Sequence, residues 1–166
     1  MTRTNRIRAA VVTATAVVTA ATVSMGVSQA GGPRTAPEPG KKQIAALFDR
    51  WNAALQTGDP EQVADLYAKD AVLLPTVSNK IRTDHAEIVD YFEHFLQNRP
   101  VGKKVETIVN VLDTDSAIDT GIYEFTLTDP KTGAERVVEA RYTYEYEKRG
   151  GKWLIVNHHS SAMPEG

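Results

Sequence analysis

The spacing of hydrophobic residues changes near residue 100, and this change predicts the order of the secondary structure. Before that point, apolar residues recur every three to four positions, as they do along one face of a helix. After it, apolar and polar residues alternate, as in strands that cover a core on one side. The pattern predicts helices over residues 41–56, 59–67 and 84–98, a short strand over 71–74, and longer strands over 104–112, 117–128, 136–147 and 152–161.

Local signals mark the ends of these elements. Asp59 is suited to cap the second helix, and Gln62 completes a capping box with it. Thr83 or Asp84 can cap the third helix in the same way. Residues 149–151 contain two glycines, which tolerate positive φ and therefore predict a tight hairpin between the last two strands.

The order of elements predicts an α+β domain, in which about three N-terminal helices pack on a curved antiparallel sheet. Such a sheet has to curl around the long first and third helices to bury both of them. The curl produces a cone, and the wide end of a cone is a natural place for a ligand pocket. The outer face of the sheet is expected to be rich in Val, Ile, Tyr and Trp, which predicts a homodimer or higher oligomer.

The first thirty residues follow the three-part plan of a secretory signal peptide. A basic start precedes an uncharged stretch over residues 9–27, and small residues stand before a cleavage position near Ala30. Residues 31–40 contain three prolines and predict a flexible leader, and residues 41–165 form the folded domain. We therefore expect a secreted or extracytoplasmic protein without stable membrane insertion after cleavage. An uncleaved transmembrane anchor is the alternative.

Charge and composition exclude several classes of function. The 166 residues suit one domain, and those beyond residue 30 include 16 basic against 21 acidic side chains. An acidic domain without a basic cluster is a poor partner for nucleic acid. The absence of cysteine excludes disulfides and thiolate chemistry. We expect no metal, because His85 and His94 are out of phase on their helix, and no cofactor, because the sequence lacks a phosphate-binding loop.

Several motifs, in this order and spacing, resemble the nuclear transport factor 2-like superfamily. The resemblance is closer to the association domain of calcium/calmodulin-dependent protein kinase II and to its bacterial relatives of the SgcJ/EcaC type. The motifs are Phe48-x-x-Trp51-Asn52, Tyr91-Phe92-Glu93-x-Phe95-Leu96, Gly151-Lys152-Trp153 and His158-His159-Ser160-Ser161. The resemblance covers the whole predicted domain and implies a cone-shaped fold and self-association.

The resemblance also implies a basic pocket that accepts carboxylates, but this sequence departs from it. Two arginines and a histidine of that pocket fall on Tyr144, Ser160 and Ile88 here. The cationic pocket is therefore largely absent. Arg141, on the penultimate strand, or Arg82, near the mouth of the cone, could replace part of it.

His158 and His159 are the first candidates for catalysis, because a neutral imidazole can act as a general base near pH 7. Neighbouring strand residues point to opposite faces, so only one of the two is expected to face the cone. Regular alternation puts Leu154, Val156, His158 and Ser160 on one face, and Trp153, Ile155, Asn157 and His159 on the other. A hydrogen-bonded histidine with a purely structural role is the alternative.

Other side chains are candidates for ligand contacts or acid–base chemistry. Tyr142, Tyr144 and Tyr146 form a row that predicts either a pocket wall or core packing. The candidate ligand-binding residues are Arg141, Tyr144, Ser160, Trp51, Phe92 and Arg82. For an isomerase mechanism, the candidate bases are Asp65 beside Tyr67, Asp70, and Asp90 beside Tyr91.

The sequence therefore predicts a secreted, homo-oligomeric domain that binds an unknown small molecule and whose partner is a second copy of itself. An enzyme of isomerase, cyclase or oxidoreductase type acting on a hydrophobic or polyketide-like molecule is the first alternative. A structural oligomerisation module is the second. An open cone with converging polar side chains favours the first two functions, whereas a cone filled by Phe48, Phe92 and Tyr144 favours the third.

Overall fold

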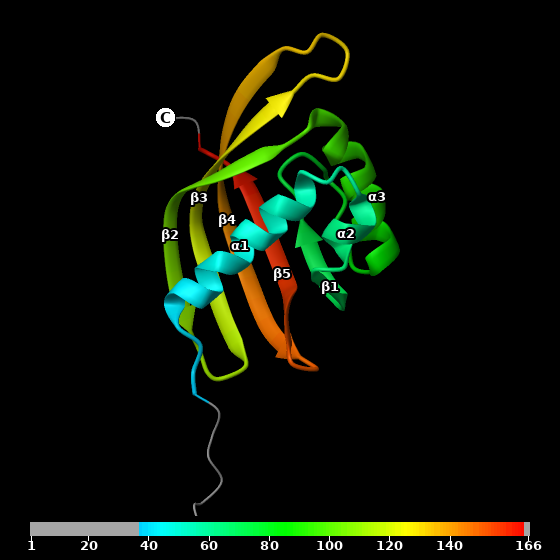
Figure 1. Ribbon diagram of the computed structural model, residues 1–166. Helices are drawn as coiled ribbons and strands as arrows, with labels where there is room; N and C mark the ends of the chain where they lie inside the picture. Colours follow the sequence, from blue (N-terminus) through cyan, green and yellow to red (C-terminus); the bar gives the residue numbers. More distant parts are fainter. Residues whose placement is uncertain (1–36, 165–166) are drawn as a thin grey trace, which may run out of the picture. The chain divides into compact units, whose positions relative to one another are not determined.

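A computed structural model of the protein describes residues 37–164. The predicted signal peptide, its cleavage position and most of the leader lie outside the described residues. The elements follow the predicted order (Figure 1): α1 (Lys41–Leu55), α2 (Pro60–Ala64), β1 (Tyr67–Leu74), α3 (His85–Phe95), a 3-10 turn (Leu96–Asn98), β2 (Val101–Val111), β3 (Ser116–Thr128), β4 (Glu135–Arg149) and β5 (Lys152–Ala162). None of the helices between residues 37 and 164 is long and apolar enough to span a membrane.

The predicted caps are present, with one difference in detail. The Asp59 carboxylate accepts the backbone N–H groups of Glu61 and Gln62, and that of Asp84 accepts the N–H of Glu87. The Gln62 side chain donates to the Asp59 carboxylate at 2.8 Å instead of reaching back to the backbone. The second helix ends earlier than predicted, and Tyr67 opens β1, where it pairs with β5.

The five strands form one sheet in the order β1-β5-β4-β3-β2. Strands β2 to β5 are an antiparallel meander, as predicted, but β1 pairs with β5 in parallel. The difference arises because the chain leaves β1 through α3 and starts the meander at the opposite edge of the sheet. Three reversals then bring β5 back beside β1.

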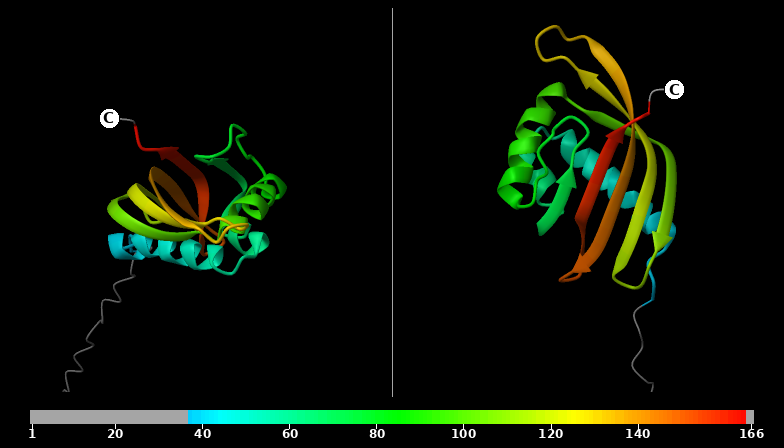
Figure 2. Two further views of the ribbon diagram at one scale, coloured as in Figure 1. Left: turned by 90° about the horizontal axis from the view of Figure 1, so that it is seen from above. Right: turned by 180° about the vertical axis from the view of Figure 1, so that it is seen from behind.

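The helices cover one face of the curved sheet. Figure 1 shows α1 running across the sheet, with α2 and α3 beside β1. Seen from behind, β3, β4 and β5 lie in front of α1 without a described helix over them, and the β3–β4 hairpin projects beyond the rest (Figure 2, right). This arrangement gives the sheet a concave face toward the helices and a bare outer face.

Aromatic side chains fill most of the space between α1 and the concave face. The buried members are Phe48, Trp51, Tyr67, Phe92, Tyr123, Phe125, Tyr142, Tyr144 and Tyr146. The ring of Phe48 stacks on Tyr142 with 6.1 Å between centroids, and Trp51 meets Tyr144 edge-on at 5.7 Å. The tyrosine row of β4 therefore faces the core, and the expectation of tyrosines on the outer face was wrong.

Candidate functional site

A β-bulge in β5 determines which of its side chains face the helices. Ile155 and Asn157 pair with adjacent residues of β4, so Val156 between them is left without a partner. Ile155 before the bulge is buried, and so are His158 and Ser160 after it. Regular alternation, expected from the sequence, puts Ile155 on the opposite face from His158. That prediction was wrong because the bulge shifts the alternation by one residue.

A cavity of about 60 Å³ lies between α3, the end of β1 and the concave face of the sheet. A buried water needs about 10–15 Å³ of such volume, so the cavity has room for roughly four to six non-hydrogen atoms. Its wall consists mainly of apolar and aromatic side chains: Trp51, Leu73, Pro75, Thr76, Val77, Tyr91, Phe92, Phe95, Tyr123, Phe125, Leu127, Val138, Ala140, His158 and Ser160. The cone is thus neither wide open nor completely filled. Phe48 and Tyr144 fill its interior beyond the cavity, and Phe92 forms part of the cavity wall.

His158 is the most unusual residue of this wall. Only 3% of its surface is exposed, and its ring stacks on Tyr144 with 4.1 Å between centroids. Its Nδ1 lies 2.8 Å from the hydroxyl of Tyr67, which in turn accepts the indole N–H of Trp51 at 3.1 Å. Its Nε2 is buried and has no hydrogen-bond partner among the described residues.

These contacts define the protonation state of His158. Burial, with a smaller contribution from His159, lowers the pKa of His158 to about 3, so the ring is neutral at physiological pH. The hydroxyl of Tyr67 accepts from Trp51, whose indole can only donate, and its own proton is satisfied only if it is donated to Nδ1. The neutral ring therefore carries its proton on Nε2. A neutral imidazole has one lone pair, and here Tyr67 occupies it.

Three hydroxyl groups form a second polar feature of the wall. Tyr123 donates to the Ser160 hydroxyl at 2.5 Å, and that hydroxyl lies 2.5 Å from the hydroxyl of Thr76. Ser160 and Thr76 share one hydrogen bond but have two protons. One hydroxyl proton is therefore left over at the cavity wall.

The structure brings together four of the predicted site residues and separates the others. Trp51, Phe92, His158 and Ser160 line the cavity. Tyr144 lies behind the ring of His158, and its buried hydroxyl has no partner among the described residues. The remaining three predicted residues do not line the cavity: His159, Arg141 and Arg82. His159 and Arg141 are exposed, because they lie on the outer face of the sheet.

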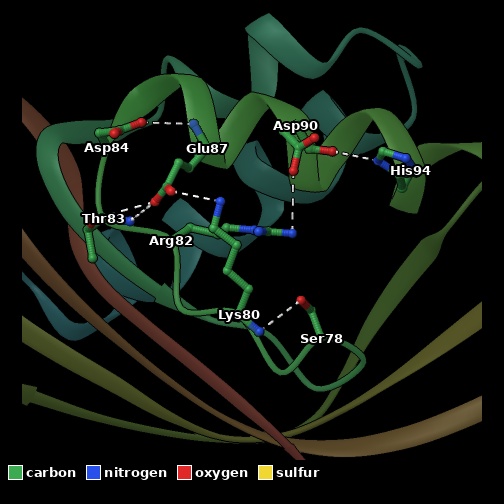
Figure 3. A network of polar contacts seen from close by, with 8 residues as sticks. All are labelled: Ser78, Lys80, Arg82, Thr83, Asp84, Glu87, Asp90 and His94. Atoms are coloured by element: carbon green, nitrogen blue, oxygen red, sulfur yellow. Dashed lines mark hydrogen bonds and ion pairs between the residues drawn. The ribbon is translucent and has the colours of Figure 1, made fainter.

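Arg82 lines a separate outer pocket of about 300 Å³ beside the cavity. Its guanidinium is nearly buried, pairs with the Asp90 carboxylate at 3.4 Å, and lies over the ring of Tyr91. Figure 3 shows that this contact belongs to a network that ties the segment after β1 to α3. In the same network, Glu87 binds Lys80 at 2.8 Å. The charge of Arg82 is therefore balanced by Asp90 outside the cavity.

Sequence reasoning missed two important features. Tyr67 was named only beside Asp65, at the end of a predicted helix, and its contact with His158 was missed because the two residues are far apart in the sequence. Asp119 was also missed, although it is in phase with the inward residues of β3 and alternation could have revealed it. The predicted bases do not reach the interior: Asp65 and Asp90 are exposed, and Asp70 pairs with Arg149 at the surface. Within residues 37–164, no three His, Asp or Glu side chains gather as metal ligands would.

Asp119 is a fully buried carboxylate beneath α1, outside the cavity. It accepts a hydrogen bond from the Tyr142 hydroxyl at 3.2 Å, and its Oδ2 has no partner among the described residues. Burial raises its pKa from 3.8 to about 6, although the bond from Tyr142 acts in the opposite direction. The folded protein therefore holds this proton more tightly than the unfolded chain does.

Asp119→Asn is expected to stabilise the domain at pH 7.5 and not at pH 4. Between pH 4 and 6 the unfolded chain loses the proton of Asp119 before the folded protein does, so the free energy of unfolding falls as pH rises. A pKa raised to about 6 corresponds to a loss of up to about 3 kcal/mol. Urea unfolding of both proteins at the two pH values measures this. An equal difference between the proteins at pH 4 and pH 7.5 would contradict the assignment of Asp119.

Comparisons with known proteins agree with this geometry. The family model of the calcium/calmodulin dependent protein kinase II association domain matches residues 40–164. Comparison with curated proteins gives no match. A crystal structure from Xanthomonas campestris, provisionally assigned to the same association domain, is 59% identical, with a TM-score of 0.74 over 79% of this chain and 95% of that one.

Two more distant structures share the fold. The association domain of C. elegans CaMKII is 14% identical, with a TM-score of 0.61 over 74% of this chain and 95% of that one. A ketosteroid isomerase-like protein from Erwinia carotovora atroseptica is 17% identical, with a TM-score of 0.62 over 75% of this chain and 97% of that one. At these identities the likeness concerns the fold alone.

Proposed function

The chain belongs to the calcium/calmodulin dependent protein kinase II association domain family, and from this premise we propose that it is an exported, self-associating domain that binds a small molecule in the cavity beside His158. One observation carries the proposal. A cavity with room for roughly four to six non-hydrogen atoms has a mainly apolar wall and a few polar residues, among them Ser160 and Thr76. An apolar wall with a small number of polar groups is typical of a small-molecule site.

The same geometry favours binding over general-base catalysis. A general base needs a free lone pair near the substrate, but the lone pair of His158 lies on Nδ1 and is occupied by Tyr67. His159, the other candidate base, lies on the outer face and is exposed. The candidate carboxylates Asp65, Asp70 and Asp90 do not line the cavity either.

Binding can be tested with a small probe that fits the cavity, such as isobutene, which has four non-hydrogen atoms. We expect a saturable shift of the Trp51 indole N–H signal in NMR spectra, because Trp51 lines the cavity. The indole signal of Trp153, which does not line it, serves as the internal control. At about −1.5 kcal/mol per atom at best, the Kd can be no tighter than tens of micromolar. If the Trp51 signal does not change up to the solubility limit of isobutene, the alternative of a structural oligomerisation module is favoured.

Self-association is proposed for the outer face of the sheet. The described helices leave this face bare (Figure 2), and it carries the partly exposed side chains of Ile118, Ile122 and Thr120 beside the exposed Ile108. Without tyrosines or tryptophans, it is less apolar than the sequence suggested. A charge at its middle, introduced by Ile122→Lys, is expected to lower the mass measured by light scattering. A wild-type protein that is monomeric at micromolar concentration would contradict self-association.

Export through the predicted signal peptide is the remaining element of the proposal. It rests on the basic start, the uncharged stretch and the small residues before Ala30 in the sequence. Mass spectrometry is expected to find a mature N-terminus near residue 31. An intact N-terminus in the membrane fraction would instead indicate the transmembrane anchor.

A further inference from the structure

We infer that a second copy of this chain packs on the outer face of the sheet about a two-fold axis that crosses the strands at Thr143, and that Arg141 of each copy pairs with Glu145 of the other. This inference rests on the proposed self-association and makes it more specific. It derives from the pairing register of the strands, from the charges on the outer face, and from the lack of ion pairs for these charges among residues 37–164.

The pairing register arranges the outward side chains of β3 and β4 in rows that run across the sheet. The pairs are Glu145 with Ile118 in the first row, Thr143 with Thr120 in the middle row, and Arg141 with Ile122 in the third row. Arg141 is exposed and the other members are partly exposed, whereas the intervening residues Tyr142 and Tyr144 are buried. The three rows therefore belong to the outer face, which the described helices leave bare (Figure 2).

Arg141 and Glu145 carry opposite charges on opposite sides of Thr143. Neither forms an ion pair with any of residues 37–164. Four residues along a strand span about 13 Å, which separates the two groups within one copy. By contrast, Lys103 and Glu124 on the same face pair with each other at 3.4 Å. The middle of the outer face thus offers one positive and one negative charge to a partner.

A two-fold axis that runs across the strands at Thr143 makes this face complementary to itself. Such an axis reverses the order of the rows in the second copy, so Arg141 faces Glu145 of that copy and Ile122 faces Ile118. Packed sheets lie about 10 Å apart and cross at about 30°, and the long side chains of Arg and Glu can together span this gap. Each charge therefore meets its opposite, and each isoleucine meets an isoleucine.

An axis that runs along the strands gives a worse match. It keeps each row opposite the same row of the second copy, wherever on the sheet the axis lies. The row of Glu145 contains no basic side chain, because its other members are Val72, Asn157, Ile118 and Asn110. The carboxylate of Glu145 would then be covered without a counter-charge, which is unfavourable. The charge pattern therefore favours the axis across the strands.

The test exchanges the two charges. Sedimentation equilibrium measures the dimer Kd of the wild type, of Arg141→Glu, of Glu145→Arg and of the double variant. Each single substitution is expected to raise the Kd about tenfold or more, because two attractions between the copies become two repulsions. The double variant is expected to return to within about threefold of the wild type, because the pairs form again with their charges reversed.

Glu139→Arg is the matched control for Glu145→Arg. Glu139 is exposed on the same strand and face, two residues beyond Arg141, and its substitution changes the net charge by the same amount. Because the outer face is convex, Glu139 lies away from the contact between the copies, and the Kd is expected to stay unchanged (Figure 2). Equal effects of Glu139→Arg and Glu145→Arg, or a double variant as weak as the single ones, would overturn the inference and leave self-association intact. A monomeric wild type would refute both.

A second measurement tests the direction of the axis without a change of charge. The chain has no cysteine, so an introduced thiol is unique. At a concentration at which the variants are dimeric, a short bismaleimide is expected to join Ile118→Cys to Ile122→Cys in an equimolar mixture. It is not expected to join two copies of Ile122→Cys, because the axis across the strands places these about 13 Å apart along the strand direction. Mass spectrometry identifies the products, and cross-linking of Ile122→Cys to itself in preference to the mixed product would overturn the inference.

Discussion

Gly121→Ala is expected to destabilise the domain by about 3 kcal/mol or more, or to prevent folding. A Cβ atom at this position would lie 1.9 Å from the carbonyl oxygen of Glu106 and 2.7 Å from its carbonyl carbon. Both are backbone atoms of β2, which cannot rotate away as a side chain can. Relief requires that β2 separate from β3, beside the irregularity in their pairing between Lys104 and Glu106. Urea unfolding followed by circular dichroism measures the loss.

Gly40→Ala is the matched control for this prediction. Gly40 precedes α1 with a φ of −72°, and an added Cβ would meet no atom within 4 Å. The control should cost less than about 1 kcal/mol, the usual difference between glycine and alanine at the start of a helix. If Gly121→Ala were as stable as Gly40→Ala, the close approach of β2 to Gly121 would be wrong.

Tyr67→Phe is expected to destabilise the domain by about 2–4 kcal/mol, the second large effect. The hydroxyl of Tyr67 joins the indole N–H of Trp51 to Nδ1 of His158, and all three groups are buried. Removing it leaves a buried donor and a buried acceptor without partners, each at a cost of about 1–3 kcal/mol. The free energy of unfolding in urea at pH 7 measures the effect.

Tyr91→Phe is the control for the loss of a tyrosine hydroxyl. Tyr91 also lines the cavity, but its hydroxyl makes no hydrogen bond to any of residues 37–164. Its removal should change the free energy of unfolding by less than about 0.5 kcal/mol. Equal effects of the two substitutions would show that Tyr67 does not bridge Trp51 and His158.

The parts of the fold that depend on local signals could be predicted from the sequence. The helix starts at Asp59 and Asp84 depend on side chains and N–H groups within three residues of each other, and the structure confirms both. Helical and strand periodicity also predicted the order of the elements. The resemblance of the motifs predicted the family, because motifs in a fixed order reflect the whole fold and not one contact.

The errors concern contacts between segments that are distant in the sequence. Tyr67 belongs to a strand because β1 pairs with β5, about ninety residues later. The bulge at Val156 exists only because β4 and β5 pair with unequal spacing, so alternation along β5 alone could not reveal it. The size of the cavity likewise depends on how aromatic residues of several elements share one space. The chemistry of His158 follows from such contacts and was accessible only from the structure.

The central claim is that the buried His158 is neutral and accepts the hydroxyl proton of Tyr67, and nitrogen NMR of its imidazole ring tests it most directly. Long-range ¹⁵N–¹H spectra of the folded protein distinguish a ring proton on Nε2 from one on Nδ1. We predict a proton on Nε2, a bare Nδ1, and no titration of this ring between pH 5 and 8. A proton on Nδ1, or a ring that titrates within this range, would contradict the account.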